Sequence, residues 1–245
     1  MRKSIVLSFL CCLIVQFCIA QAVEVTYTQQ VKNIPQKARA DMSDAALKFL
    51  FTTRAVLQAT NDVSWYQETG EMVFTEKKSA TNKDLPANLP LKQEEITSIQ
   101  SEKVYRKSLN DTYKSFKEQS LVLMYRSVAH VFRVEEVLPA YNWTITNEVA
   151  TIAGLICKKA TTMTTMQPQM PVEAWFTDEI PISSGPGSFH GLPGLILKIE
   201  TPVFSIAADK VRFVASPVIK KPTEGELMTS EQLMQRISQR PKADN

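Results

Sequence analysis

Apolar and polar residues alternate along much of the chain after residue 20, and this period of two constrains the fold more than any other feature. It is clearest in Val23–Tyr27, in Val172–Phe176 and in Phe204–Ile206, which resumes at Val211–Phe213. Because neighbouring side chains of a strand point to opposite faces of a sheet, these segments predict half-buried β-strands. Further β-rich segments are Leu47–Phe51, Val104–Leu109, Leu121–Arg126, Val128–Val134, Thr144–Val149 and Ile152–Ala160. The pattern predicts a mainly β domain with an antiparallel, meander-like sheet.

One segment near the C-terminus has the pattern of a helix instead. Ser230–Gln239 carries apolar residues at helical spacing, and Thr229 with Gln232 fits a capping box at its start. We therefore expect a short C-terminal helix within a tail that spans residues 217–245.

Composition indicates a single globular domain. Of the 245 residues, 44% are hydrophobic and 22% are charged, which supplies enough apolar side chains for one sizeable core. Prolines and asparagines in residues 80–92 predict a surface loop rather than a linker between domains. The segment Gln93–Lys117 is compatible with a helix or a strand, because it is rich in Glu and Lys. We expect the β domain to occupy residues 21–216.

The first 20 residues have the pattern of a cleavable signal peptide. A basic start precedes Ile5–Val15, which is shorter than the roughly 20 apolar residues that a membrane-spanning helix needs. We expect cleavage after Ala20, with Gln21 as the new first residue; cleavage after Ala22 is the alternative. No cysteine lies in a convincing lipobox, and no later stretch predicts a transmembrane segment. The mature chain is therefore expected in the periplasm or associated with the outer membrane.

Charge and cysteine content argue against a nucleic-acid-binding protein and against a protein stabilised by disulfides. The 28 Lys and Arg against 25 Asp and Glu give a net charge of +3, far from the strongly basic balance of proteins that bind nucleic acids. Three of the four cysteines lie in the expected signal peptide, so Cys157 has no partner for an intramolecular disulfide. A thiol nucleophile made of Cys157 and His190 lacks a third orienting group, and a buried structural cysteine is the favoured interpretation.

Residues 175–200 are the most informative segment, because four of the seven glycines of the chain fall within ten of its residues. Two four-residue turns, Gly185–Ser188 and Leu192–Leu195, each place proline second and glycine third. This order predicts type II turns with a positive φ at Gly187 and Gly194. A rigid double turn that seats a buried strand explains the segment; the alternative is a rigid loop that presents residues to a ligand. The residues of this structural motif are Gly185, Pro186, Gly187, Gly191, Leu192, Pro193, Gly194, Leu195 and Ile196.

Motifs of enzymes and metal sites are not convincing in this sequence. His190 stands where a dinucleotide fingerprint would need its third glycine, and Phe189 stands where a nucleophile elbow would need serine. Adjacent acidic pairs such as Asp178–Glu179 point to opposite faces of a strand and cannot serve one substrate. The tract Met163–Met170 could bind Cu(I), but its polar composition favours a hairpin loop. We expect no catalytic, cofactor-binding or metal-binding residues and no cofactor.

The segment Gly191–Ile196 reads GLPGLI, and the chain here resembles the GLPGLI family of exported Bacteroidetes proteins. Ala174–Phe176 and the Gly, Cys and Lys-Ala residues of Gly154–Ala160 are similar to the surrounding pattern of that family. The resemblance covers roughly residues 143–215. It implies an exported β domain with a curved sheet, shaped like a bowl or half-barrel, and it brings no catalytic residues.

These observations favour binding over catalysis. Trp175 lies on the opposite face of its predicted strand from Phe176, which a curved sheet with a lined concavity or a packed helix would explain. Trp175, Phe189 and His190 are the candidate contacts for a partner or ligand. A non-enzymatic protein-interaction module of the cell envelope is our first hypothesis, and a carrier of a hydrophobic small molecule is the alternative. A carrier needs an apolar concavity, whereas an interaction module needs an exposed patch or edge strand.

Overall fold

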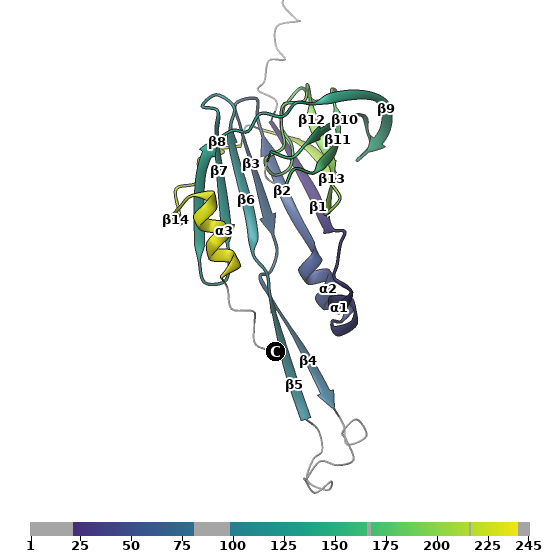
Figure 1. The fold of residues 1–245 in the computed structure, drawn as a ribbon. Helices are drawn as coiled ribbons and strands as arrows, with labels where there is room; N and C mark the ends of the chain where they lie inside the picture. The colour runs from purple at the N-terminus through teal and green to yellow at the C-terminus, as the bar shows by residue number, and fades with distance from the viewer. Residues whose placement is uncertain (1–21, 81–98, 166–167, 216, 240–245) are drawn as a thin grey trace, which may run out of the picture.

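A computed structural model describes residues 22–80, 99–165, 168–215 and 217–239 of the chain. Most of these residues lie in strands, which form one large sheet and a separate two-stranded ribbon (Figure 1). The strands are β1 Ala22–Val31, β2 Thr52–Ala59, β3 Val63–Thr69, β4 Val73–Ala80, β5 Ile99–Arg106, β6 Leu109–Ser115, β7 Ser120–Arg126, β8 Val131–Val137, β9 Thr144–Ile152, β10 Leu155–Met163, β11 Pro171–Thr177, β12 Leu195–Glu200, β13 Phe204–Val214 and β14 Glu226–Leu227. The helices are α1 Gln36–Asp41, α2 Asp44–Phe51 and α3 Ser230–Ser238.

The large sheet has the strand order β14-β8-β7-β6-β3-β2-β1-β13-β12-β11-β10-β9. Its neighbours are antiparallel except for the short parallel pair of β14 and β8, which makes the sheet mixed. Strand β1 pairs with both β2 and β13 and so joins the two halves of the sheet. The ribbon of β4 and β5 is inserted between β3 and β6 and projects away from the sheet in Figure 1.

The sheet is curved and does not close into a barrel, as the sequence predicts. Its pairing shifts between Thr26 and Tyr27, between Lys158 and Ala160, and between Trp175 and Phe176. Such irregularities increase the local twist and bend a strand. Strands β9 and β14 remain at the two edges.

The main core lies against the concave face of the sheet. It combines alternate residues of β1, β2 and β11 and buried residues of β10 and β12 with the segment that connects β11 to β12. That segment buries Ile180, Ile182 and Leu192, each about 1% exposed, so the double turn packs into the bowl. The predicted rigid double turn therefore forms part of the core rather than a loop that stands free of it.

A smaller cluster covers the convex face, where Tyr113, Val122 and Met124 pack with Ile219 of the C-terminal tail. The tail then reaches the sheet edge, where β14 pairs with β8, and continues into α3. Within α3, Arg236 lies over the ring of Phe132 at 5.6 Å. The tail therefore contacts both faces of the sheet around one edge.

The predicted C-terminal helix is confirmed, including its capping box. The Thr229 hydroxyl accepts a hydrogen bond from the Gln232 backbone, and the Gln232 side chain accepts one from the Thr229 backbone. No helix within the described ranges is long and apolar enough to span a membrane.

Two strand predictions are wrong. Leu47–Phe51 belongs to α2, where the Ser43 hydroxyl caps the helix by accepting a hydrogen bond from the Ala46 amide at 3.2 Å. This local cap, with Asp44 in the first turn, outweighs the β-propensity of the apolar run. Val104–Leu109 is also not one strand, because β5 ends at Arg106 and β6 begins at Leu109. The loop predicted for residues 80–92 lies almost entirely outside the described residues.

Candidate functional site

The concave face that the double turn leaves uncovered forms a cavity of about 480 Å³. Strands β3, β6, β7, β8 and β13 contribute to its wall, together with the double turn, the loop between β10 and β11, and α3. This volume falls in the range of small-molecule sites, which is roughly 300–1,000 Å³. The cavity is the candidate functional site.

Most of the cavity wall is apolar. Its apolar lining includes Leu121 and Leu123 from β7, Ile206 of β13, Phe189 beside the double turn and Met234 of α3. These residues come from segments far apart in the sequence, and the curvature of the sheet brings them together. An apolar wall of this kind releases water when it takes up an apolar ligand.

A polar strip on β3 and β6 interrupts the apolar wall. Tyr66 pairs with Thr112 across the two strands, and Glu68 lies two residues along on the same face. Oε2 of Glu68 accepts hydrogen bonds from the backbone amide of Asn110 at 2.7 Å and from its Nδ2 at 3.3 Å. Burial raises the pKa of Glu68, and burial together with the nearby Glu68 carboxyl raises that of Tyr66. Tyr66 therefore keeps its phenolic proton.

A buried lysine holds the double turn beside the cavity. Nζ of Lys114 donates hydrogen bonds to the backbone oxygens of Gly185, Gly187 and Phe189, at 2.7, 2.8 and 3.0 Å. The residue has no exposed surface, and burial lowers its pKa to about 7. Three carbonyl oxygens match the three protons of the ammonium group. Lys114 thus fixes the turn that forms one wall of the cavity, and sequence reasoning did not identify it.

Hydrogen bonds of its ring and its backbone hold His190 next to the same turn. Its Nε2 lies 2.8 Å from the carbonyl oxygen of Pro139, which can only accept, so Nε2 carries the proton. The Nε1 group of Trp143 donates to the backbone oxygen of His190 at 2.8 Å. Burial, together with the charge of Lys114, lowers the pKa of His190 to about 4, so the ring is neutral near pH 7.

The two predicted turns need glycine for different reasons. Gly187 has φ +55°, as predicted. The prediction of a positive φ at Gly194 is wrong: a Cβ there would lie 2.1 Å from the carbonyl oxygen of Thr177, so close packing requires glycine. The positive φ near the second turn, +92°, is found at Gly191, the residue just before it.

The three predicted contact residues have different positions. Phe189 lines the cavity but is only 7% exposed and packs on Tyr141, with ring centroids 5.5 Å apart. His190 adjoins the cavity without lining it. Trp175 lies on the other face of β11 from Phe176, beside a second groove of about 470 Å³ whose wall includes Lys198 and Glu200. The structure thus brings Phe189 and His190 together and separates them from Trp175.

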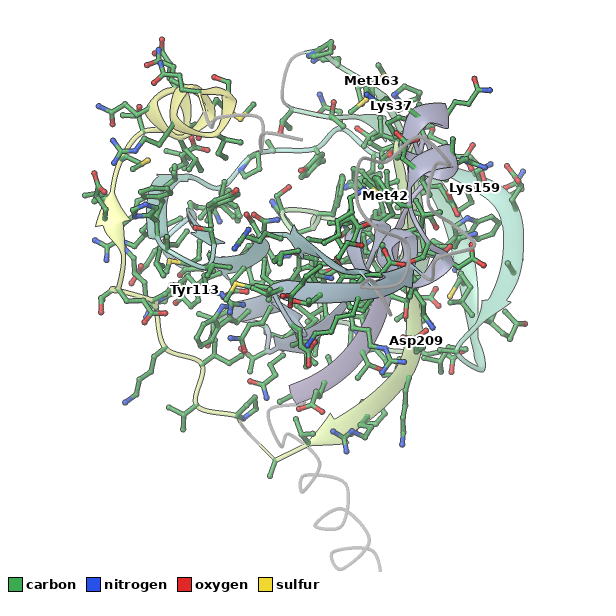
Figure 2. The ribbon with its side chains drawn as sticks, turned by 90° about the horizontal axis from the view of Figure 1, so that it is seen from below. Lys37, Met42, Tyr113, Lys159, Met163 and Asp209 are labelled. Carbon is green, nitrogen blue, oxygen red and sulfur yellow. The ribbon has the colours of Figure 1, made fainter. Side chains whose placement is uncertain are left out.

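The ring of Trp175 contacts the charged side chain of Lys159. Nζ of Lys159 lies 5.9 Å from the centroid of its ring. The same ammonium group forms ion pairs with Glu148 and Glu173, each at 3.2 Å. In Figure 2, Lys159 and Met163 of β10 lie far from Tyr113 of the convex cluster.

The sulfur-containing residues have local structural roles. Met163 ends β10 and pairs with Pro171 at the start of β11, and the Thr164 amide donates a hydrogen bond to the Met170 oxygen at 2.9 Å, so the described ends of the tract have the geometry of the predicted hairpin. Met166 lies outside the described residues. Cys157 is a free, buried thiol whose pKa is raised to about 11 by burial. No cluster of three or more His, Cys, Asp or Glu residues occurs in the part of the chain described.

Comparison with known proteins finds one family model that is similar to the segment around the double turn. A family model described as a protein of unknown function (Porph_ging), a Bacteroidetes-associated domain, matches residues 162–198, which include the double turn. No curated protein matches the sequence significantly.

A structure of PNGF-II in the C2 space group is similar in fold, with a TM-score of 0.52 at 14% sequence identity. The similarity covers 90% of this chain but 33% of the PNGF-II chain, so this protein corresponds to about a third of that length. At this identity the similarity shows the fold alone.

Proposed function

We propose that this protein binds a hydrophobic small molecule in the concave cavity and acts as its carrier. The single observation that supports this function is the mostly apolar cavity of about 480 Å³ on the concave face. A carrier requires such a concavity, and the Lys114 contacts with the double turn keep one of its walls in place.

Binding of a neutral apolar dye tests the proposal. N-phenyl-1-naphthylamine should bind the wild-type protein at one saturable site. Leu123→Trp fills the cavity and should weaken binding by at least roughly tenfold, because a ligand can no longer be buried there. Val218→Trp adds the same ring at a position that is 81% exposed and should leave dye affinity unchanged. Absence of saturable binding to the wild-type protein would refute a carrier function.

A protein-interaction function is the second candidate, and the free edge of β9 favours it. Ile145 and Val149 on this edge strand are 49% and 61% exposed. An extended segment of a partner could add to such an edge by main-chain hydrogen bonds. Native mass spectrometry of the protein from its own envelope separates the two functions. A retained small mass supports the carrier, whereas a bound protein that Val149→Lys releases supports the interaction module.

We also propose that the protein is a non-enzymatic member of the GLPGLI family, exported through a signal peptide of residues 1–20 to the periplasm or outer membrane. The basic start, the apolar Ile5–Val15 and the motif Gly191–Ile196 support this proposal. Intact-mass measurement of the mature protein should give a chain that begins at Gln21. A retained leader or an added lipid mass would contradict it.

A further inference from the structure

Glu68 is a charged group of the cavity wall that its protein neighbours satisfy only in part. The residue is 6% exposed and lines the cavity. Two nitrogens of Asn110 donate to one carboxylate oxygen, Oε2, at 2.7 and 3.3 Å, whereas Oε1 accepts no hydrogen bond from the described residues. The Tyr66 hydroxyl beside it has neither a partner nor accessible surface, but Oε1 is not such an atom. Oε1 therefore remains accessible at the wall of the cavity.

Two basic residues lie near Glu68, but neither forms an ion pair with its carboxylate. Nη2 of Arg126 binds Oδ1 of Asp111 at 2.7 Å and donates to the backbone oxygen of Glu68 at 2.9 Å. Nζ of Lys107 donates to the backbone oxygen of Thr52 at 3.1 Å. Within the described parts of the chain, the Glu68 carboxylate thus has no cationic partner, which a buried charge requires for favourable burial.

The other charges of the cavity wall have the same sign. Its described residues include a second acid, Glu136, and neither lysine nor arginine. An anionic head group would therefore meet like charge, and a purely apolar ligand would cover Oε1 without giving it a partner. A protonated amine carries both the donor and the opposite charge that the Glu68 carboxylate lacks, and such charge-assisted hydrogen bonds are stronger than neutral ones.

We propose that the ligand is a cationic amphiphile, with an apolar body and a protonated amine, and that Oε1 of Glu68 binds the amine. The inference rests on the proposed carrier function and specifies the chemistry of its ligand. The apolar body contacts Leu123 and Ile206 of the wall, and Asn110 holds the carboxylate in position through Oε2.

Three compounds with one tail and different heads test the proposal. Dodecylamine, dodecanol and dodecanoate compete with N-phenyl-1-naphthylamine for the wild-type protein, below their micelle concentrations and at about pH 7, where the amine is protonated and the carboxylate is ionised. Dodecylammonium should bind at least roughly tenfold more tightly than dodecanol, because only its head adds opposite charge to the hydrogen bond, and dodecanoate should bind most weakly. Equal or tighter binding of dodecanol or dodecanoate would overturn the proposal, whether or not any variant folds.

Glu68→Gln assigns the preference to one carboxylate. Glutamine keeps an oxygen that can accept from Asn110 and removes the charge, so the variant should bind dodecylammonium at least roughly tenfold more weakly and change dodecanol affinity much less. Glu136→Gln is the matched control, because it makes the same change at the exposed acid of the same wall. It should bind dodecylammonium within about twofold of the wild-type protein, since an exposed charge contributes little.

The possible results separate the head-group site from the carrier function. If a folded Glu68→Gln keeps the wild-type preference for dodecylammonium, or if Glu136→Gln alone loses it, the assignment to Glu68 is wrong. If the dye binds the wild-type protein at no saturable site, the carrier function itself fails. Dye binding without a preference for the cationic head leaves a carrier and removes only the inference about its ligand.

Discussion

The buried ammonium group of Lys114 predicts an unusual dependence of stability on pH. Burial lowers the pKa of Lys114 from the ordinary value of 10.5 to about 7 in the folded protein. Between these two values the unfolded chain binds more protons than the folded one, so the free energy of unfolding should rise with pH. Integration from about pH 7 to about pH 9 gives a gain of about 2 kcal/mol from this one residue.

The measurement compares wild-type protein with Lys114→Met by urea unfolding at about pH 7 and about pH 9. Other titrating groups affect both proteins, so their contributions cancel in the difference. Below about pH 7 the wild-type protein carries the full cost of the buried charge, and this cost decreases as the pH rises. Relative to Lys114→Met, the wild-type protein should therefore gain about 2 kcal/mol over this interval.

Lys117→Met removes an exposed lysine near the end of the same strand and is the control. Its stability should follow that of the wild-type protein at both pH values. If Lys114→Met also follows the wild-type protein, the three carbonyl oxygens hold the proton on Nζ throughout, and the reasoning from burial is refuted. Deprotonation should also free one of these three oxygens, because a neutral amine donates only two hydrogen bonds.

Three further predictions concern the double turn. Gly194→Ala should destabilise the protein by roughly 2 kcal/mol or more, because its methyl group would meet the Thr177 oxygen. Gly187→Ala should cost about 1 kcal/mol, because the added methyl group has open space and only the left-handed backbone is strained. Chemical denaturation of both variants checks this order of stability. Phe189→Ser should cost roughly 3–5 kcal/mol in the same assay, as expected for a packed aromatic ring, and a near-neutral result would restore Phe189 as a surface contact. Because burial lowers the pKa of His190 to about 4, stability should fall as the pH drops below about 6.5, and this fall should be smaller in His190→Asn.

Local patterns account for the elements that the sequence predicts correctly. Alternation places Val23 and Val25 on the buried face of β1, and the capping box at Thr229 and Gln232 begins α3 at the expected residue. These signals lie within a few residues of the structure that they specify. The error at α2 has the same origin, because its Ser43 cap is an equally local signal that the apolar run Leu47–Phe51 obscured.

The candidate site depends on partners that local patterns do not contain. Lys114 alternates with Thr112 and Asn110, a polar pattern that is typical of a solvent-exposed face, yet its three acceptors lie more than 70 residues along the chain. Tyr66 and Glu68 share the inner face of β3, but only the pairing of β3 with β6 and the curvature of the sheet bring them to a cavity. Strand alternation could have placed Tyr66 and Glu68 on one face, whereas the cavity itself follows from tertiary structure.

The double turn and the cavity are two consequences of the same packing. The turn buries Ile182 and Leu192 against one part of the concave face, and the remaining part stays open beside Phe189. An apolar cavity persists only if its walls cannot move inward, since collapse would recover apolar contacts. Lys114 and the close approach at Gly194 prevent this movement by fixing the turn on both sides. The glycine-rich motif therefore maintains the shape of the cavity.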